Sequence, residues 1–320
     1  MIRKKAISQT SSTNILHVSN IFPRPKKDGG TRTIINLKNL NKFIPYEHFK
    51  MESLENIKHL LKKGDLMVKI DLKDAYWSVP ISKKSQNMMA FSWEGNLYKF
   101  LVMAFGLGPA PRIFTKIMKV PISILRKLSI RILIYQDDML IMAESLLRIQ
   151  TARDTTLYLL QNLGFSINWD KSILTPLPRL EFLGMIVDSH LMTISLPEGK
   201  VRDLLSKCKE MTSNPSISLR ELSQLIGKLN ATRPAVTEAP LQLRGLQQNL
   251  ISAQRLNLSY EDPLVLNKEG LLEIQWWIKN LTIAKSRPIH LAPPQMIIET
   301  DASTTAWGAH QVGGITIGDH

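Results

Sequence analysis

The amino-acid sequence predicts an α+β fold, and three observations support this prediction. Short apolar segments bounded by turn residues, which are typical of strands, recur up to about residue 196. Segments with apolar residues at helical spacing lie between them, and residues 198–285 are mainly of this kind. The chain has 320 residues, 44% of them hydrophobic and 21% charged, which is enough for two or three domains with cores of their own.

The first expected elements surround a glycine turn. Residues 1–20 are polar and are expected to be loosely ordered. Two extended stretches within 21–50 flank the turn 26–30, where Gly29 and Gly30 supply the positive φ values of a tight hairpin. Ser53 is expected to cap a helix over 53–63. Strands are expected at 66–72, 89–93 and 97–103.

The second group of elements includes a hairpin with acidic residues at its turn. A helix over 109–128 is expected to kink or break at Pro121, and a later helix over 145–163 should stop at Gly164. Between these helices, the apolar strands 130–135 and 139–143 are separated only by Gln136-Asp137-Asp138. The remaining expectations are a hairpin of strands 181–187 and 191–196, a capping box at Ser218–Glu221, a proline-spaced linker over 288–294 and a strand over 299–309.

Charge and composition narrow the class of protein. Lys and Arg total 41 against 27 for Asp and Glu, and this net charge of +14 favours a polyanionic partner, most simply nucleic acid. The alternative is a cationic, well-solvated surface without such a partner. No apolar run reaches the roughly 18 residues of a membrane span, and the N-terminus lacks a signal core, so no membrane partner is expected. An intracellular site is expected, with the choice between cytoplasm and nucleus open.

Cysteine and histidine do not indicate a site of their own. Cys208 is the single cysteine, so it cannot form an internal disulfide, which fits a reducing compartment. It lies in a helical pattern and is interpreted as a packing residue. The seven histidines are scattered without the spacing of metal ligands, and no zinc site is assigned.

The candidate catalytic residues are aspartates at the ends of two apolar strands, one ending at Asp71 and one at Asp137-Asp138. Burying an unpaired charge is costly, although either segment alone could be a strand-end aspartate that caps a turn. Two carboxylates about 4 Å apart repel by about 4 kcal/mol at an effective dielectric of 20, and a divalent cation reverses that sign. We therefore predict that Asp71, Asp137 and Asp138 hold two Mg²⁺ ions, or Mn²⁺ as the alternative.

The turn Tyr135-Gln136-Asp137-Asp138 resembles the Tyr-x-Asp-Asp signature of reverse transcriptases, and the order of motifs over residues 20–190 is similar to that family. The resemblance implies that Asp71 is the first catalytic aspartate. It also implies that Tyr76 lies below the ribose and favours dNTP over NTP. The implied nucleotide-binding residues are Lys26, Lys27, Arg32, Asp74, Ala75, Tyr76, Phe105, Gly106 and Lys171, and the implied primer grip is Phe182, Leu183 and Gly184.

Several of these roles have ordinary alternatives. Lys26 and Lys27 could be charges at a hairpin tip, whereas the planar fork of Arg32 suits phosphate better. Lys171 could be a solvated lysine, with no part in proton transfer to pyrophosphate. Gln136 is less usual than an apolar residue at its position in the signature, but it does not remove a metal ligand.

The resemblance implies a right-hand polymerase of α+β class, with fingers and palm over 21–190 and a helical thumb and connector over 191–287. Residues 295–320 resemble the start of an RNase H domain, in which Asp301 would be a metal ligand. Asp319 is the only later acidic residue, so that ribonuclease site is incomplete and the chain is interpreted as truncated. In its residue pattern over the whole chain, the sequence is most similar to DIRS-type retrotransposon enzymes, then to gypsy-type and pararetroviral enzymes.

The function implied by the resemblance is RNA-directed DNA synthesis for a retrotransposon. Its partners would be a primer-template, either RNA/DNA or DNA/DNA, together with dNTPs and other element-encoded proteins. Two alternatives stay open: a non-catalytic remnant that binds nucleic acid, and an RNA-dependent RNA polymerase, against which Tyr76 argues.

Overall fold

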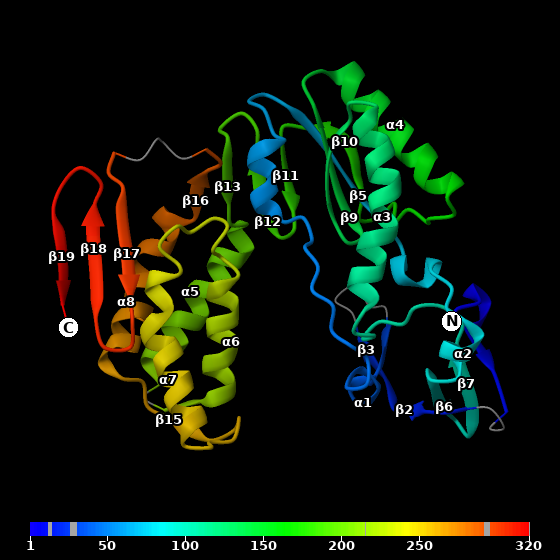
Figure 1. Ribbon diagram of the computed structural model, residues 1–320, viewed down its shortest axis with the longest axis horizontal. Helices are drawn as coiled ribbons and strands as arrows, with labels where there is room; N and C mark the ends of the chain where they lie inside the picture. The colour runs from blue at the N-terminus through cyan, green and yellow to red at the C-terminus, as the bar shows by residue number, and fades with distance from the viewer. Residues whose placement is uncertain (12–14, 26–30, 215, 291–294, 320) are drawn as a thin grey trace.

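The computed structural model describes residues 1–11, 15–25, 31–214, 216–290 and 295–319. Figure 1 shows a mixed lobe that contains the N-terminus, a helical lobe, and a small sheet at the C-terminal end. A sheet in the middle of the view lies between the mixed and the helical lobes. The α+β class predicted from the sequence is confirmed.

The N-terminal part of the mixed lobe is built on a four-stranded sheet in the order β1-β7-β6-β2. Its strands are β1 (Ile7–Gln9), β2 (Val18–Ser19), β6 (Ala90–Trp93) and β7 (Asn96–Phe100), and beside it lies a hairpin of β3 (Ile21–Pro25) and β4 (Thr31–Ile35). The short helices are η1 (Ile2–Lys4), α1 (Lys38–Asn41) and α2 (Lys83–Gln86). The expectation of a loosely ordered segment 1–20 is wrong for its described residues, since η1, β1 and β2 lie there and Ile7 is buried. The expected strands around the glycine turn therefore pair as a hairpin, whereas the turn itself lies outside the described residues.

The centre of the mixed lobe is an antiparallel sheet in the order β10-β5-β9-β8. Its strands are β5 (Leu66–Asp71), β8 (Arg131–Tyr135), β9 (Asp138–Ala143) and β10 (Ile173–Leu177). Val68 and Ile70 pack in one core with helices α3 (Ala110–Lys127) and α4 (Leu146–Asn162). Their neighbour Met67 belongs to the core on the opposite face, because successive side chains of a strand alternate. Burial on both faces explains why these strands are continuous apolar runs.

Two local expectations in this lobe need correction, and one is confirmed. The helix expected over 53–63 is a shorter 3-10 helix, η3 (Leu54–His59), whose capping box joins Ser53 and Asn56. Pro121 does not divide the predicted helix, because α3 runs continuously through it. Gly164, with φ of 85°, ends α4 as the sequence predicts.

The sheet between the lobes contains β11 (Arg179–Phe182), β12 (Met185–Asp188), β13 (Thr193–Ser195) and β16 (Ser286–Pro288), in that order. The prediction of one strand over 181–187 is wrong, since Leu183 and Gly184 form a two-residue turn with φ of 49° and 71°. Positive φ at both positions is the geometry of a tight hairpin turn. Because β16 follows the helical lobe in the chain, both ends of that lobe are anchored in this sheet.

The helical lobe consists of α5 (Glu198–Ser213), α6 (Leu219–Asn230), α7 (Arg244–Arg255) and α8 (Lys268–Ala284), with the short η5 (Leu241–Leu243) and the two-stranded pair β14 (Ile217–Ser218) and β15 (Pro263–Leu264). The predicted capping box at the start of α6 is confirmed, with Ser218 and Glu221 bonded reciprocally. Cys208 is buried in the core, as expected for a packing residue.

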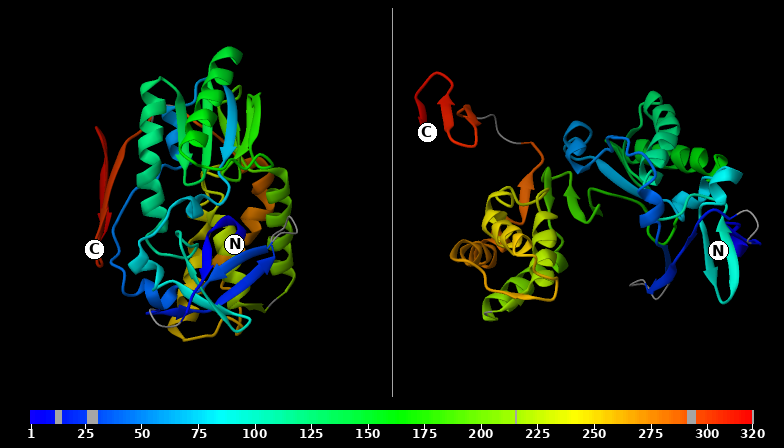
Figure 2. Two further views of the ribbon diagram at one scale, coloured as in Figure 1. Left: turned by 90° about the vertical axis from the view of Figure 1, so that its right-hand side faces the viewer. Right: turned by 60° about the horizontal axis from the view of Figure 1, so that its bottom comes forward.

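The C-terminal sheet is the red element in Figure 1 and projects from the helical lobe in Figure 2. Its strands are β17 (Ile298–Ala302), β18 (Trp307–Gln311) and β19 (Thr316–Asp319). The single strand expected over 299–309 is wrong, because a turn at 303–306 divides it into β17 and β18. Within the described part of the chain, no helix is long and apolar enough to cross a membrane.

Candidate active site

The strand pairing of the central sheet brings the three predicted aspartates to one end of it. Asp71 ends β5 and lies directly opposite Asp138 at the start of β9. Tyr135 pairs with Asp138, so that Gln136 and Asp137 are the two residues of the turn between β8 and β9. Gln136 has φ of 54°, a left-handed conformation that side chains other than glycine adopt rarely. The sequence prediction that these carboxylates meet is thus consistent with the register.

Asp71 is fixed by residues that the sequence analysis did not single out. Its side chain is 8% exposed, and its Oδ1 accepts a hydrogen bond of 2.7 Å from Asn168 Nδ2. The backbone N–H of Asp71 donates to Ser172 Oγ at 3.0 Å. Asn168 and Ser172 flank Lys171, the one residue of this segment that the resemblance marked. Asn168 could not be predicted to orient Asp71, because their contact depends on which distant segments lie side by side in the fold.

The carboxylates are short of compensating charge. Burial raises the pKa of Asp71, against the hydrogen bond from Asn168, and the charge of Asp138 raises it further. Burial is also the main cause that raises the pKa of Asp137, where Asp138 and Asp71 add to the effect. Lys171 acts in the opposite direction on the pKa of both carboxyl groups, so this predicted lysine lies within electrostatic reach of the site.

Asp138 has a different environment from the other two. Lys69 Nζ lies 3.0 Å from Asp138 Oδ1, which is an ion pair. The same oxygen is buried and has no hydrogen-bond partner among the described residues. The Lys69 ammonium is thus the cation that this buried oxygen already contacts, and a metal ion would have to replace it.

The donor set fits magnesium, with a limit on how many carboxylates take part. Over the described ranges, no group of three or more His, Cys, Asp or Glu side chains is arranged to hold a metal ion. Mg²⁺ commonly uses only one or two carboxylates together with substrate phosphates. Asp71 and Asp138 lie directly opposite each other and Asp137 lies in the adjoining turn, but Asp138 would have to leave Lys69 to bind a metal ion.

Tyr76 is enclosed next to the acidic turn. Its ring lies 5.1 Å from that of Phe105 and 5.6 Å from that of Phe114, between centroids. Its hydroxyl donates a hydrogen bond of 3.0 Å to Gln136 Oε1. Tyr76 belongs to the short 3-10 helix η4 (Ala75–Ser78). The residue directly before this helix, Asp74, has a left-handed backbone conformation with φ of 51°. Asp74, Ala75, Tyr76 and Phe105 therefore lie close together near the acidic turn, and their role in nucleotide binding stays a prediction.

The neighbouring glycine segment is held against the N-terminal part of the lobe. Gly106 has φ of 95°, and a Cβ atom there would lie 3.2 Å from the carbonyl oxygen of Ile35. Asn41 holds the segment at two points, since its Nδ2 donates to Gly106 O and its Oδ1 accepts from Gly108 N, both at 2.8 Å. Gly106 thus allows a close approach to the backbone of Ile35, and its predicted role in nucleotide binding stays a prediction.

Some predicted residues lie elsewhere or outside the described part. Lys26 and Lys27 lie outside the described residues, and Arg32 belongs to β4, although its side chain is not described. Lys4, which the sequence analysis did not consider, forms an ion pair with Asp74. Asp301 is in β17 of the separate C-terminal sheet, where its Oδ1 accepts from the N–H of Ala302 at 2.9 Å.

The predicted primer-grip residues share one hairpin but not one environment. Phe182 is fully buried, whereas Leu183 and Gly184 form the turn. Lys200 of α5 donates from Nζ to the carbonyl oxygen of Gly184 at 2.7 Å. This lysine joins the turn to the first helix of the helical lobe and was missed from the sequence.

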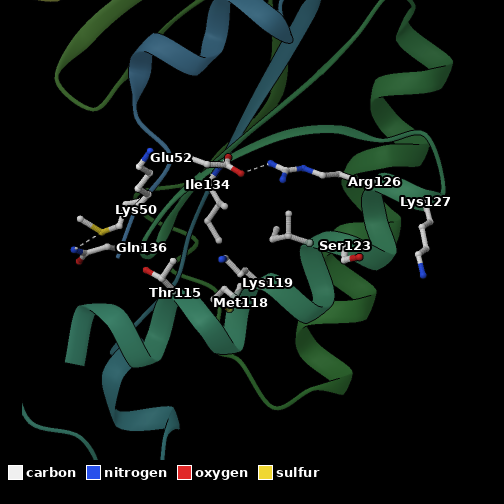
Figure 3. Close-up of a pocket in the computed structure, with 12 residues that line it drawn as sticks. Lys50, Glu52, Thr115, Met118, Lys119, Ser123, Arg126, Lys127, Ile134 and Gln136 are labelled. Atoms are coloured by element: carbon white, nitrogen blue, oxygen red, sulfur yellow. Dashed lines mark hydrogen bonds and ion pairs between the residues drawn. The ribbon is translucent and has the colours of Figure 1, made fainter. Parts of the chain in front are cut away.

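A cavity of about 650 Å³ adjoins the acidic turn (Figure 3). Gln136 lies at one end of it and the ion pair of Glu52 with Arg126, 2.6 Å long, at the other. Gln136 Nε2 donates to Met51 Sδ at 3.6 Å across the same wall. The two ends of the Gln136 amide therefore have different partners. Oε1 accepts from the Tyr76 hydroxyl, and Nε2 donates to Met51 in the cavity wall.

Comparisons with known proteins agree with this geometry. The family model described as "Reverse transcriptase (RNA-dependent DNA polymerase)" matches residues 24–187. The putative enzymatic polyprotein of cassava vein mosaic virus is 27% identical over 292 residues, which cover 89% of this chain and 41% of the polyprotein. The enzymatic polyprotein of cauliflower mosaic virus, strain Strasbourg, is 25% identical over 296 residues, covering 88% of this chain and 39% of that protein.

Solved structures show the same fold. The foamy viral protease-reverse transcriptase in complex with double-stranded DNA has a TM-score of 0.72 at 19% identity, covering 99% of this chain and 63% of that one. Its complex with an RNA/DNA hybrid has a TM-score of 0.71, also at 19% identity, and covers 98% and 40%. The architecture is that of a polymerase, and the chain spans about two fifths of the two plant-virus polyproteins.

Proposed function

The chain belongs to the reverse transcriptase family, and we propose that it is the RNA-directed DNA polymerase part of a retroelement protein, adding dNTPs to a primer 3′ end. One observation carries this proposal: Asp71, Asp137 and Asp138 lie at one end of the central sheet with too little positive charge around them. Such a cluster is costly for a fold and useful for chemistry that needs a cation.

In this function Asp71 and Asp137 would hold Mg²⁺, or Mn²⁺, and Asp138 would support them. Two ions bound there would stabilise charge on the attacking and leaving oxygens of an in-line displacement. The protein's own part is positioning. Asn168 holds the Asp71 carboxylate in place, and Lys171 contributes positive charge near the carboxylates, where a triphosphate would arrive.

The partner we propose is a primer-template duplex, either RNA/DNA or DNA/DNA. The net charge of +14 supports it, since phosphate contacts by Lys and Arg dominate nucleic-acid affinity and make it salt-dependent. The foamy viral structures, which share the fold, hold double-stranded DNA and an RNA/DNA hybrid. The dNTP would lie between Tyr76 and the carboxylates, with Lys26, Lys27 and Arg32 as the phosphate contacts.

The finer assignments are also proposals. We assign the chain to a retrotransposon of DIRS or gypsy type on the residue pattern of its sequence. We expect the protein inside the cell, in cytoplasm or nucleus. Other element-encoded proteins are proposed as further partners. We interpret residues 295–320 as the start of an RNase H-like fold. Asp301 in β17 would be one of its metal ligands.

The test is primer extension on an oligonucleotide-primed RNA template with dNTPs and Mg²⁺. We expect extension by the wild-type protein, none by the Asp137→Asn/Asp138→Asn double variant, and unchanged extension by Asp154→Asn. Asp154 is the matched control because its carboxylate is exposed on α4 and paired with Arg153. Extension that survives the double substitution would refute the proposed site, and salt-sensitive duplex binding without extension would favour a remnant that only binds nucleic acid.

A further inference from the structure

We propose that Gln136 is a specificity-determining positioning residue, which holds the Tyr76 ring in place through a hydrogen bond and so sharpens the choice between deoxyribose and ribose. The inference rests on the proposed function, because Tyr76 selects the sugar only if the site binds nucleotides. It goes beyond that function in assigning a role to the variable residue of the acidic turn.

The first observation is how the Tyr76 ring is held. Phe105 and Phe114 contact the ring at centroid distances of 5.1 and 5.6 Å, with tilted and edge-on geometry. Phe105 is itself 36% exposed, whereas Tyr76 is buried. The only polar contact at the tip of the ring, among the described residues, is the 3.0 Å hydrogen bond to Gln136 Oε1.

The second observation is the direction of that hydrogen bond. An amide oxygen only accepts, so the Tyr76 hydroxyl donates to Gln136 Oε1. The opposite end of the amide donates to Met51 Sδ, which sets the orientation of the side chain. Burial, together with the charges of Asp137 and Tyr135, raises the pKa of Tyr76 to about 12, so the hydroxyl keeps its proton at neutral pH.

The third observation is where the backbone puts Gln136. Its left-handed φ of 54° lies in the turn that also carries Asp137. Its side chain lies in the wall of the cavity between α3 and the segment 50–52 (Figure 3). One residue thereby fixes Tyr76 relative to the catalytic turn. An apolar residue of similar length, such as Met, would fill the same wall without accepting from the hydroxyl.

The activity test compares kcat/KM for a dNTP with kcat/KM for the matching ribonucleotide. We expect Gln136→Met to lower this ratio by between about twofold and tenfold, the effect of one neutral hydrogen bond. Tyr76→Phe should lower the ratio similarly, and the double variant no further, since both changes remove the same bond. Ser123→Ala, which changes the cavity wall away from Tyr76, is the matched control and should leave the ratio unchanged. A general loosening of the site would lower both kcat/KM values together.

A second measurement does not depend on turnover. The two single variants and the double variant form a cycle of chemical denaturation midpoints, in which a real hydrogen bond gives shifts that are less than additive. Additive shifts would overturn the inference, as would a dNTP-to-ribonucleotide ratio that Gln136→Met leaves unchanged while the wild-type protein extends primers normally. A wild-type protein that extends no primer would instead refute the proposed function, and the selectivity part of this inference with it.

Discussion

The strongest stability prediction concerns Arg131, which joins the start of β8 to the start of β5. Its Nη2 donates to Asp65 Oδ1 at 2.7 Å, its Nη1 also bonds Asp65, and the same Nη1 donates to the carbonyl oxygen of Leu60 at 2.7 Å. The Asp65 side chain is fully buried and that of Arg131 is 19% exposed. The pair thus fixes the end of the central sheet opposite to the three aspartates.

We expect Arg131→Met to destabilise this sheet by about 3–5 kcal/mol, because removing one partner leaves the other as an uncompensated buried charge. After the substitution Asp65 would keep the N–H of Lys62, which donates to Oδ2 at 2.7 Å, but no cation. Hydrogen exchange of the amides in β5 and β8 measures the effect locally. At about 1.4 kcal/mol per factor of ten, protection should fall by roughly two to three and a half orders of magnitude.

Two controls separate this account from a general loss of packing. Arg148→Met removes an exposed arginine that pairs with Glu144 and should leave protection of β5 and β8 unchanged. The Arg131→Met/Asp65→Leu double variant removes the stranded charge and should recover part of the lost protection. A loss below about 1 kcal/mol in Arg131→Met, or a double variant less protected than the single one, would refute the reasoning.

Three further predictions follow from the site and the helical lobe. Asp71→Asn should abolish extension yet raise the melting temperature of the metal-free protein at pH 7, because burial raises the Asp71 pKa and disfavours the ionised form in the fold. Lys200→Met should shorten extension products several-fold on long templates, because the bond of Lys200 Nζ to the Gly184 carbonyl oxygen is lost. Cys208 should react with iodoacetamide at pH 8 only as fast as the protein unfolds, since burial raises its thiol pKa to about 12.

Each of these three predictions can be contradicted, either by the pH dependence of stability or by a control variant. The gain from Asp71→Asn should vanish below the ordinary pKa of 3.8, where the carboxyl is protonated in both states, and should develop as the pH rises through the raised pKa. The Cys208 thiol adds stability below its ordinary pKa of 9.0, and this is lost as the pH rises towards 12. Lys228→Met, which removes a surface pair on α6, should not shorten the products. Opposite results would contradict the respective prediction.

The hairpin with the acidic turn and the helix caps could be predicted because their signals are local. The apolar runs 130–135 and 139–143 predict β8 and β9, and the turn must lie among the three residues between them. It consists of Gln136 and Asp137, while Asp138 begins β9. Ser218 and Glu221 are three residues apart and identify the start of α6 by themselves. These are patterns in which the partners are neighbours in the sequence.

The parts that could not be predicted depend on distant partners or on unusual turn residues. Asn168, 97 residues from Asp71, orients that carboxylate, and Lys200 reaches Gly184 from another element. The turn at Leu183 was missed because leucine is not a turn residue, so the apolar run was interpreted as one strand. Pro121 was expected to kink or break the helix, but α3 continues through this residue, which is buried in the core-facing side of the helix.

The charge partners at the two ends of β5 distinguish a carboxylate that stabilises the fold from one that belongs to the proposed site. At its start, buried Asp65 receives a guanidinium and a backbone N–H, so its charge is compensated within the protein. At its end, Asp71 receives the amide of Asn168, while Asp137 and Asp138 lie in the adjoining turn and strand with Lys69 and Lys171 as the nearby cations. Of the two buried aspartates, Asp65 directly before β5 is paired with a guanidinium, whereas Asp71 at the end of β5 has no ion pair among the described residues. The end with Asp71 is therefore the one that a bound cation would stabilise, as the proposed function requires.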